Sequence, residues 1–383
     1  MTSSEFIPVN EPLLGERELE YVTECIRTGW ISSAGRFIET FEEQWAKYCG
    51  RQYGIAVSNG TVALQLAVAA LHLPPGSEII LPDFTIISCA TAVVFNNCVP
   101  VLVDADPVTF CMDVSQVEAK ITARTKAIMP VHIYGHPVDM DPLLALAEKY
   151  QLAIIEDAAE VHGAQYLSHH HNPTGEWLTC GGIGTISTFS FYANKLITTG
   201  EGGMLLTDDA EIAERARQMR NLCFLPGRRF YHEELGFNFR LTNLQAALGV
   251  AQLERMDEIV TRKRQMGVAY TERLKHLKGI QLPIEAEWAK HVYWMYALVL
   301  AEDTGLDAAE FARHLKKEGV DTRPFFLGMH EQPALHAQGL FNSETYPVSR
   351  RIARQGVYLP SGLAITEEQI DRVATSVQKV LAQ

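Results

Sequence analysis

The chain has 383 residues, of which 47% are hydrophobic and 21% charged, and its formal net charge is −13. This is the composition of a globular protein long enough to bury a sizeable core, and the length suggests two or three domains. The acidic excess argues against nucleic acid as a partner, because phosphate contacts need clustered Lys and Arg. A nucleotide-sized ligand, which needs only a few local donors, stays compatible.

The sequence carries no signal for export or for a membrane. The N-terminal stretch MTSSEFIPVNEP lacks a basic region followed by an apolar run, and no stretch reaches the ~18 apolar residues of a membrane span. We therefore expect a cytoplasmic protein without a membrane partner. The seven cysteines are scattered without a C-x-x-C pair. They predict neither a disulfide framework nor a structural zinc site, and most should be buried as small hydrophobes.

Short apolar runs alternate with helix-like segments as far as about residue 210. Runs bounded by turns, mostly rich in β-branched residues, predict strands at Glu78–Leu81, Val99–Val103, Ala127–Val131, Leu152–Ile155 and Thr185–Phe191. Helices are predicted between strands, for example at Thr61–Leu71 and Asp141–Tyr150. This alternation predicts an α/β fold, in which a mostly parallel sheet is covered by helices on both faces.

The pattern changes beyond Thr242. The sequence of residues 242–277 predicts a long helical stretch that is rich in charged residues. A smaller mixed region follows, with a strand predicted at His291–Leu300, a helix at Asp307–Glu318 and a terminal helix from Thr366. We interpret residues 1–255 as a large α/β domain and residues 256–383 as a small α+β domain.

The segment Leu167–Gly182 is predicted to be a loop, and it contains three adjacent histidines. Adjacent side chains on an extended loop point in different directions, and no acidic or Cys partner is suitably spaced. We therefore expect a solvated loop and no metal site, with metal binding as the alternative interpretation.

Two turns in the first half of the chain are candidates for ligand binding. Ser58–Thr61 follows the apolar segment GIAV and precedes a helix, so free amide groups could bind a phosphate there; the alternative is an ordinary N-cap by Asn59 or Thr61. Asp157 follows an apolar strand, where α/β folds bind ligands. It is a candidate partner for a cation such as a pyridinium nitrogen, or else it caps the following turn.

Two later motifs complete the pattern. Lys195 follows the apolar strand FSFYAN and precedes a Gly-rich turn. A lysine kept near hydrophobic groups and another positive centre has a lowered pKa and attacks carbonyls, whereas an ordinary lysine snorkels to solvent. The segment 236–243 interleaves Asn238 and Arg240 with aromatic residues; by itself it is typical of a loop with surface polar groups.

Together, and in this order, these motifs resemble the DegT/DnrJ/EryC1/StrS family of sugar aminotransferases, which are fold-type I enzymes dependent on pyridoxal 5'-phosphate (PLP). The resemblance runs from about Ile7 to the C-terminus, and the block FSFYANKLITTGEGGM is its most specific part. It implies a large domain with a mostly parallel, seven-stranded type of sheet. Within the family the likeness is greatest to the GDP-perosamine synthases, on WISSAGRF, PVLVDADPVTF, TKAIMPVHIYG, IEDAAE, GFNFRLTNLQAALGVAQLER and WMY.

The resemblance also implies roles for individual residues. Lys195 would be the catalytic residue, joined to PLP as a Schiff base, and Asp157 would pair with the pyridine nitrogen. Asn238 would reach the cofactor phosphate from a neighbouring subunit, which implies a homodimer or tetramer with shared sites. The implied cofactor set is Gly60, Thr61, Ile86, Asp157, Ser190, Lys195 and Asn238. The implied substrate set is Trp30, His162, Arg240 and His330.

The implied reaction is transfer of an amino group from glutamate to the C4 ketone of a nucleotide-linked 4-keto-6-deoxy sugar. GDP-4-keto-6-deoxymannose would give GDP-perosamine, a deoxyamino sugar of the kind used in O-antigen biosynthesis. Alternatives are a UDP- or dTDP-linked keto-sugar, a PLP-dependent sugar dehydratase, or a silent scaffold homologue. Dehydratase relatives carry His in place of Lys195, which argues against that activity. Ile86 stands where the family usually has an aromatic residue, and Leu327 where it often has a histidine.

Overall fold

The computed structural model describes residues 6–225, 227–228 and 230–382. Its centre is a seven-stranded sheet in the order β1-β9-β8-β5-β4-β2-β3. The strands are β1 (Tyr53–Val57), β2 (Glu78–Pro82), β3 (Val99–Val103), β4 (Thr125–Ile128), β5 (Ala153–Asp157), β8 (Ile186–Ser190) and β9 (Gly203–Thr207). Strand β9 runs antiparallel to both of its neighbours, and the other neighbouring pairs are parallel. The predicted α/β fold with a mostly parallel sheet is confirmed.

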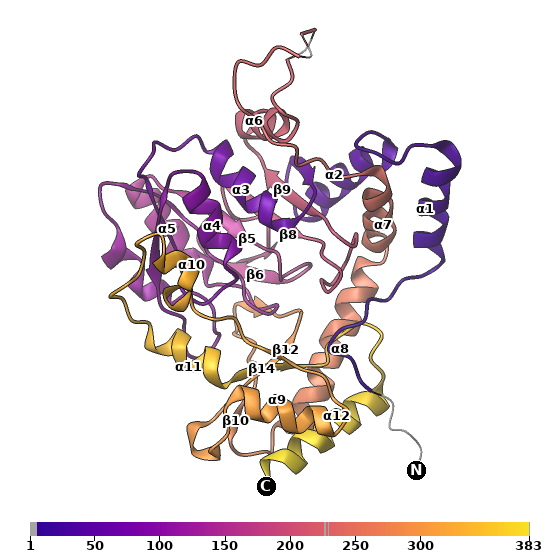
Figure 1. The fold of residues 1–383 in the computed structure, drawn as a ribbon, viewed down its shortest axis with the longest axis vertical. Helices are drawn as coiled ribbons and strands as arrows, with labels where there is room; N and C mark the ends of the chain where they lie inside the picture. Colours follow the sequence, from indigo (N-terminus) through magenta and orange to yellow (C-terminus); the bar gives the residue numbers. More distant parts are fainter. Residues whose placement is uncertain (1–5, 226, 229, 383) are drawn as a thin grey trace.

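Helices surround this sheet (Figure 1). They are α1 (Glu16–Thr28), α2 (Arg36–Tyr48), α3 (Gly60–Ala70), α4 (Ser88–Phe95), α5 (Met140–Tyr150), α6 (Ala210–Arg220) and α7 (Asn243–Leu253), with short 3-10 turns η1 (Val114–Gln116) and η2 (Glu118–Lys120). Helix α3 packs against β8 and β9, α2 against β1, and α5 against β4 and β5. The predicted strand Ala127–Val131 ends early, at Ile128. Pro130 has no amide hydrogen for the ladder, and Val131 makes only an isolated bridge to Asp157.

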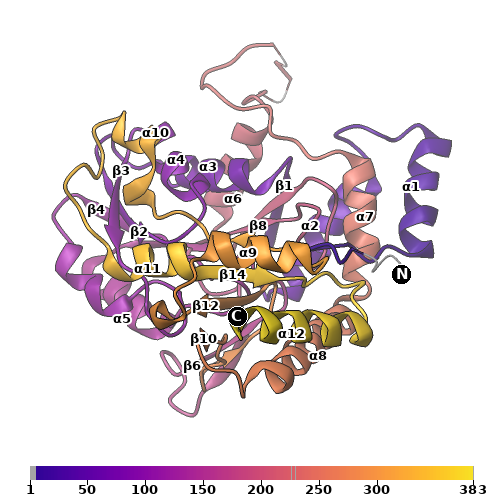
Figure 2. The same cartoon turned by 60° about the horizontal axis from the view of Figure 1, so that its bottom comes forward.

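The C-terminal part has its own sheet and its own core. Strands β10 (Ile280–Gln281), β12 (Tyr296–Leu300), β14 (Gly356–Leu359) and β13 (Arg323–Pro324) pair antiparallel in that order. The helical elements here are α8 (Met256–Leu274), η3 (Glu302–Thr304), α9 (Ala308–Lys317), η4 (Met329–Glu331), α10 (Pro333–His336), α11 (Pro347–Gln355) and α12 (Glu367–Leu381). Figure 2 shows α8, α9 and α12 gathered around β12 and β14. Their apolar side chains form a second hydrophobic cluster, separate from that of the large sheet.

Two boundaries in this region differ from the sequence-based expectation. The helical stretch 242–277 is divided at Arg255, which separates α7 from α8, and the division into domains at 255/256, still a prediction, falls at this break. The strand predicted at His291–Leu300 begins only at Tyr296. Before it, the backbone of Tyr293 has a φ of 48°. The amides of Val292 and Met295 donate to the carbonyls of Gly135 and Tyr134, which lie between β4 and α5. Long-range contacts therefore override the strand-like pattern there.

The segment predicted as a loop, Leu167–Gly182, is largely a β-hairpin, so that prediction is wrong in part. Strands β6 (Gln165–Ser168) and β7 (Glu176–Thr179) pair antiparallel, and β11 (Ala289–Lys290) joins β6 as a third strand. The tip between them, residues 169–175, and the last residues of the segment, 180–182, lie outside the strands. Each strand is too short for its alternation of side chains to be recognised in the sequence.

Two other sequence-based expectations can be compared with the structure. All seven cysteines are free and buried, as expected for small hydrophobes. Among the described residues, every helix is too short or too polar to cross a bilayer.

Candidate active site

A cavity of about 590 Å³ opens at the carboxyl ends of β5 and β8, beside the start of α3. Its wall includes most of the residues that the sequence singled out for a cofactor: Gly60, Thr61, Ile86, Asp157, Ser190 and Lys195. The C-terminal part of the chain closes it with three aromatic side chains, Trp294, Phe326 and Tyr358. Residues far apart in sequence thus meet where α/β folds bind ligands.

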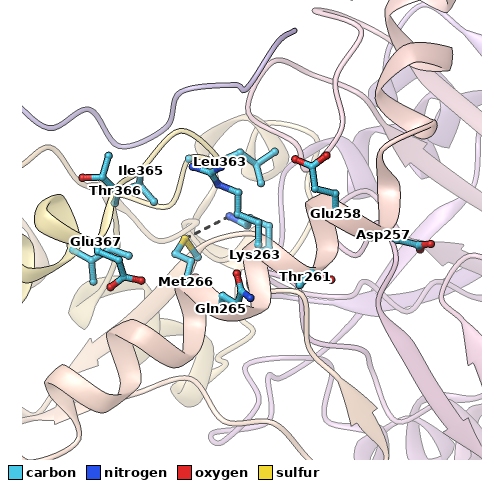
Figure 3. A pocket seen from close by; sticks show the side chains of 13 residues that line it. Asp257, Glu258, Thr261, Lys263, Gln265, Met266, Leu363, Ile365, Thr366 and Glu367 are labelled. Carbon is cyan, nitrogen blue, oxygen red and sulfur yellow. Dashed lines mark hydrogen bonds between the residues drawn. The ribbon is translucent and has the colours of Figure 1, made fainter. Parts of the chain in front are cut away.

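A second cavity, of about 660 Å³, lies between α8 and residues 362–370 (Figure 3). Acidic side chains of Asp257, Glu258 and Glu367 line it beside Met266 and Leu363. Its volume is slightly larger, but it holds none of the predicted cofactor residues. The chemistry of the side chains, not the volume, identifies the first cavity as the candidate active site.

One end of the active-site cavity is the N-terminus of α3. The Asn59 side chain caps this helix by accepting a hydrogen bond from the Val62 amide at 3.0 Å. A side chain on Gly60 would place a Cβ 2.6 Å from the Ser190 Cβ, so only glycine lets β8 approach the helix this closely. The other amides of the first turn have no partner inside a helix, and the hydroxyls of Thr61 and Ser190 border the same space. This end is therefore suited to an anion such as phosphate.

Asp157 lies at the end of β5 and is 2% exposed. One carboxylate oxygen accepts the Ala159 amide at 3.1 Å, and the other accepts the Cys89 thiol at 3.4 Å. The first contact is the turn-capping role considered from sequence. Burial raises the pKa of Asp157 because the charged form loses its hydration, so a cation in the cavity would stabilise the carboxylate.

Lys195 places its amine between a carboxylate and an indole ring. The Lys195 Nζ is 3.8 Å from Glu160 Oε1 and 3.6 Å from the ring centroid of Trp294. The side chain is 10% exposed, so it does not snorkel to solvent. Burial lowers the pKa of Lys195, and burial also raises the pKa of Glu160 to about 7. A larger fraction of neutral, nucleophilic amine follows, as the sequence predicted for a lysine near hydrophobic groups.

The Trp294 side chain is fixed from two sides. Its Nε1 donates to the Asn194 carbonyl at 2.7 Å, next to Lys195 in the chain. Its own carbonyl accepts a hydrogen bond at 2.9 Å from Lys263 Nζ, which is buried in α8. The indole that faces the amine is thus tied both to the lysine-bearing turn and to the C-terminal part of the chain.

Comparison with known proteins agrees with this arrangement. Residues 12–378 match the DegT/DnrJ/EryC1/StrS aminotransferase family. This chain belongs to that family. It is 42% identical over 376 residues to a GDP-perosamine synthase of Caulobacter vibrioides, with 98% of each chain covered. It is also 38% identical over 374 residues to a GDP-perosamine synthase of Escherichia coli O157:H7, again covering 98% of each chain. The crystal structure of S. venezuelae DesV in complex with a ketimine intermediate superposes with a TM-score of 0.89 at 32% identity, over 99% of this chain and 100% of that one.

The aminotransferase has donor groups that fit PLP, the cofactor on which its family depends. The α3 terminus suits the phosphate, Asp157 suits a protonated ring nitrogen, and the Lys195 amine lies at the same cavity. Asn194 borders the cavity with a buried side-chain oxygen that has no hydrogen-bond partner among the residues that the structure describes. Such an atom is costly unless a ligand or a water donates to it.

Of the two remaining predicted cofactor residues, Ile86 borders the cavity and Asn238 does not. Ile86 borders the cavity of the aminotransferase with 44% of its surface exposed, so an aliphatic side chain takes the position usually held by an aromatic one. Asn238 is exposed and pairs with Asn221 through an isolated bridge, outside the cavity of its own chain. This placement leaves Asn238 available to a neighbouring subunit, which stays a prediction.

The predicted substrate set does not gather at this cavity. Trp30 is exposed beside another cavity, of about 440 Å³, and Arg240 bonds to the Asn221 side chain. His162 is fully buried among Trp45, Phe189 and Phe191, and burial lowers its pKa to about 3. The expectation that His162 lines the site is therefore wrong: its aromatic neighbours hold it in the core.

His330 is also buried, at 3% exposure, and its Nδ1 pairs with Asp83 Oδ2 at 2.8 Å. That pair links the C-terminal part to the end of β2, and His330 is absent from the cavity wall. In place of these residues the cavity wall contains Glu160 and Trp294, which lie in the motifs IEDAAE and WMY but had no predicted role. Glu160 could have been suspected from its position three residues after Asp157, on the same turn.

Proposed function

We propose that this aminotransferase uses PLP to transfer the amino group of glutamate to the C4 ketone of GDP-4-keto-6-deoxymannose, giving GDP-perosamine. The observation that carries the proposal is the Lys195 amine, held beside Glu160 in a cavity that also contains Asp157 and the α3 N-terminus. The choice of sugar nucleotide is supported by the similarity to GDP-perosamine synthases over nearly the whole chain.

PLP, when bound, supplies an electron sink for the bonds that change at the substrate carbon. The α3 terminus and Ser190 would bind its phosphate, and Asp157 would hold a proton on its ring nitrogen. Lys195 would hold the cofactor through its amine, and the same amine, when free, would move a proton at the substrate carbon as a general base and acid. Glu160 lies within reach of that amine, and its raised pKa lets it hold or release a proton near neutral pH.

The rest of the proposal follows the family's chemistry. Each site accepts glutamate and the keto-sugar in turn, which requires one cavity for two unlike substrates. Asn238 completes the phosphate site of a neighbouring subunit, so the working unit is at least a homodimer, and we propose that it acts in the cytoplasm. The same reaction on a UDP- or dTDP-linked keto-sugar is the second candidate, because Leu327 replaces a histidine common in the family and is exposed.

The experiment uses purified protein with PLP and glutamate, incubated separately with GDP-, UDP- and dTDP-linked 4-keto-6-deoxy sugars. Mass spectrometry should detect an amino-sugar from the GDP substrate, and Lys195→Ala should abolish it. Turnover of a UDP- or dTDP-linked sugar alone would replace the perosamine assignment by the second candidate. Loss of the keto-sugar without gain of nitrogen would indicate a dehydratase, and absence of any PLP absorbance would indicate a silent scaffold.

A further inference from the structure

The tip of the β6–β7 hairpin meets the last turn of α5, far in sequence from the active-site lysine. His170 and His171 come from this tip, and Glu148 comes from α5. One donor atom from each of the three side chains lies within 4.8 Å of the others, and His170 Nε2 is 3.0 Å from Glu148 Oε1. The acidic partner that the sequence did not reveal is thus supplied by a helix 22 residues away.

The backbone around this cluster is fixed by the same helix. Asp141 lies seven residues before Glu148, two helical turns away on the same face of α5. Its Oδ1 accepts the Ser168 hydroxyl at 2.6 Å and its Oδ2 accepts the His169 amide at 2.7 Å. The hairpin is therefore anchored to α5 immediately before His170, which reduces the conformational freedom that a bound ion would otherwise have to remove.

The far side of the tip is ordered by a local turn. The Asn172 side-chain oxygen accepts the Thr174 amide at 3.1 Å and the Thr174 hydroxyl at 2.8 Å. His169 is turned away from the cluster, and its Nδ1 faces the Pro173 carbonyl at 3.3 Å. Of the three adjacent histidines, two share a direction and one does not, which provides a matched internal control.

Two imidazoles and one carboxylate form a donor set that suits a borderline divalent ion such as Zn²⁺. Zinc binds histidine nitrogen and carboxylate oxygen at roughly 2.0–2.2 Å, so tetrahedral ligands stand about 3.4 Å apart. The 3.0 Å separation between His170 Nε2 and Glu148 Oε1 is close to this distance, and a ring nitrogen of His171 lies within 4.8 Å of both atoms. The His170 side chain is 12% exposed, so part of the site is shielded from water.

We propose that Glu148, His170 and His171 bind one Zn²⁺ ion per chain and that the ion fastens the β6–β7 hairpin to α5. Water would complete the coordination, because the protein supplies three ligands. This site is independent of the proposed aminotransferase reaction. A simple hydrogen bond between His170 and Glu148, with no ion, is the competing explanation of the same contact.

The test uses untagged holoenzyme that has been stripped of metal with a chelator and then dialysed. Calorimetric titration with ZnCl₂ should give one site per chain, and zinc should raise the melting temperature. His171→Ala and Glu148→Gln should each weaken binding by about tenfold or more, since each removes one ligand. His169→Ala should bind zinc like the unchanged protein, and substitution of Co²⁺ should give visible bands typical of a low-coordinate site.

Absence of a stoichiometric site would overturn the proposal and leave the hydrogen bond alone. Equal weakening by His169→Ala would show that a nonspecific run of histidines binds the ion, and retained affinity in His171→Ala and Glu148→Gln would place the ion elsewhere. PLP absorbance and circular dichroism of each variant establish that it is folded. The buried cysteines are poor competitors for the ion. Amino-sugar formation is measured separately, so failure of the zinc site would not bear on the proposed activity.

Discussion

At the scale of single residues, the Lys195 amine is governed by two opposing influences. Burial lowers its pKa, and the charge of Glu160 raises it. Glu160→Gln removes that charge and should lower the pKa of Lys195 further. The measurement is the pH dependence of Lys195 labelling by an amine-reactive reagent in the cofactor-free protein, read by peptide mass spectrometry. Glu201→Gln, a change at the same cavity wall, is the control. An unchanged or raised pKa in Glu160→Gln would contradict the ion pair.

Ile86 is a second residue whose effect can be measured. An aromatic ring at this position could stack on the cofactor, adding about 1 kcal/mol beyond simple burial. Ile86→Phe should therefore tighten PLP binding by roughly fivefold, and Ile86→Ala should weaken it. The dissociation constant is obtained by titrating PLP into the cofactor-free protein and following absorbance. Weaker binding by Ile86→Phe than by the unchanged protein would show that the cavity has no room for a ring.

The sequence revealed the residues whose roles depend on local motifs. Asp157 ends β5, Gly60 begins the helix that follows β1, and Lys195 lies in the turn that follows β8, so the topology brings them to one edge of the sheet. It did not assign Trp294 to the amine, because that contact joins residues about a hundred positions apart. It also mistook His162 for a site residue, since closeness in sequence to Asp157 does not determine which way a side chain points.

At the scale of elements, helix α8 is linked to the active site through the buried amine of Lys263. Lys263 donates to the carbonyls of Trp294 and Ser361, and Figure 3 shows it at the wall of the larger cavity near Met266. Burial lowers the pKa of Lys263 from 10.5 to about 7. At a pH between about 7 and 10.5, the Lys263 amine is protonated in the unfolded chain and mostly neutral in the folded chain. The contribution of Lys263 to stability is therefore present above pH 10.5 and is lost as the pH falls toward 7.

Lys263→Met removes the titrating amine, and with it this dependence of stability on pH, while keeping the length of the side chain. The free energy of unfolding of the unchanged protein, relative to that of Lys263→Met, should rise by on the order of 2–3 kcal/mol from about pH 7 to about pH 9. Urea denaturation at the two pH values measures it. Lys275→Met, at an exposed ion pair with Glu272, should show no such change. If the difference in the free energy of unfolding between the unchanged protein and Lys263→Met did not change with pH, the Lys263 amine would stay charged in the folded protein.

Elements with strong periodicity were predicted well, and those shaped by distant contacts were not. The strand at Val99–Val103 has the predicted bounds, and α3 and α5 lie within one residue of theirs. The hairpin in Leu167–Gly182 was missed because its strands are four residues each and depend on pairing with β11. The tip of that hairpin acquires its acidic neighbour only through packing on α5, which no local pattern indicates.

At the scale of the whole molecule, the active-site cavity depends on both parts of the chain. The large sheet supplies the amine and the carboxylates, and the C-terminal part supplies Trp294, Phe326 and Tyr358. The two parts are also joined at the N-terminus, where Ile7 bridges to Val320 and packs in the C-terminal core. A cavity built between two cores can adjust its width by small movements of one against the other, which suits the proposed alternation of glutamate and a sugar nucleotide in one site.

The proposed sharing of sites between subunits leads to a prediction about mixed assemblies. Lys195→Ala removes the amine from a chain's own cavity, and Asn238→Ala removes a group proposed to serve the neighbour's cavity. Each variant alone should lose most activity. In a mixed dimer, one site carries both defects and the other carries neither. Random pairing of equal amounts makes half of the dimers mixed, so about a quarter of all sites should be intact.

Coexpression of the two variants with different affinity tags, followed by purification of the mixed species, measures this directly. The mixed dimer should recover about half of the activity of the unchanged dimer, because one of its two sites is intact. If Asn238 served its own subunit, each site of the mixed dimer would carry one defect and activity would stay as low as in the separate variants. The exposure of Asn238 outside its own cavity is the structural reason to expect recovery.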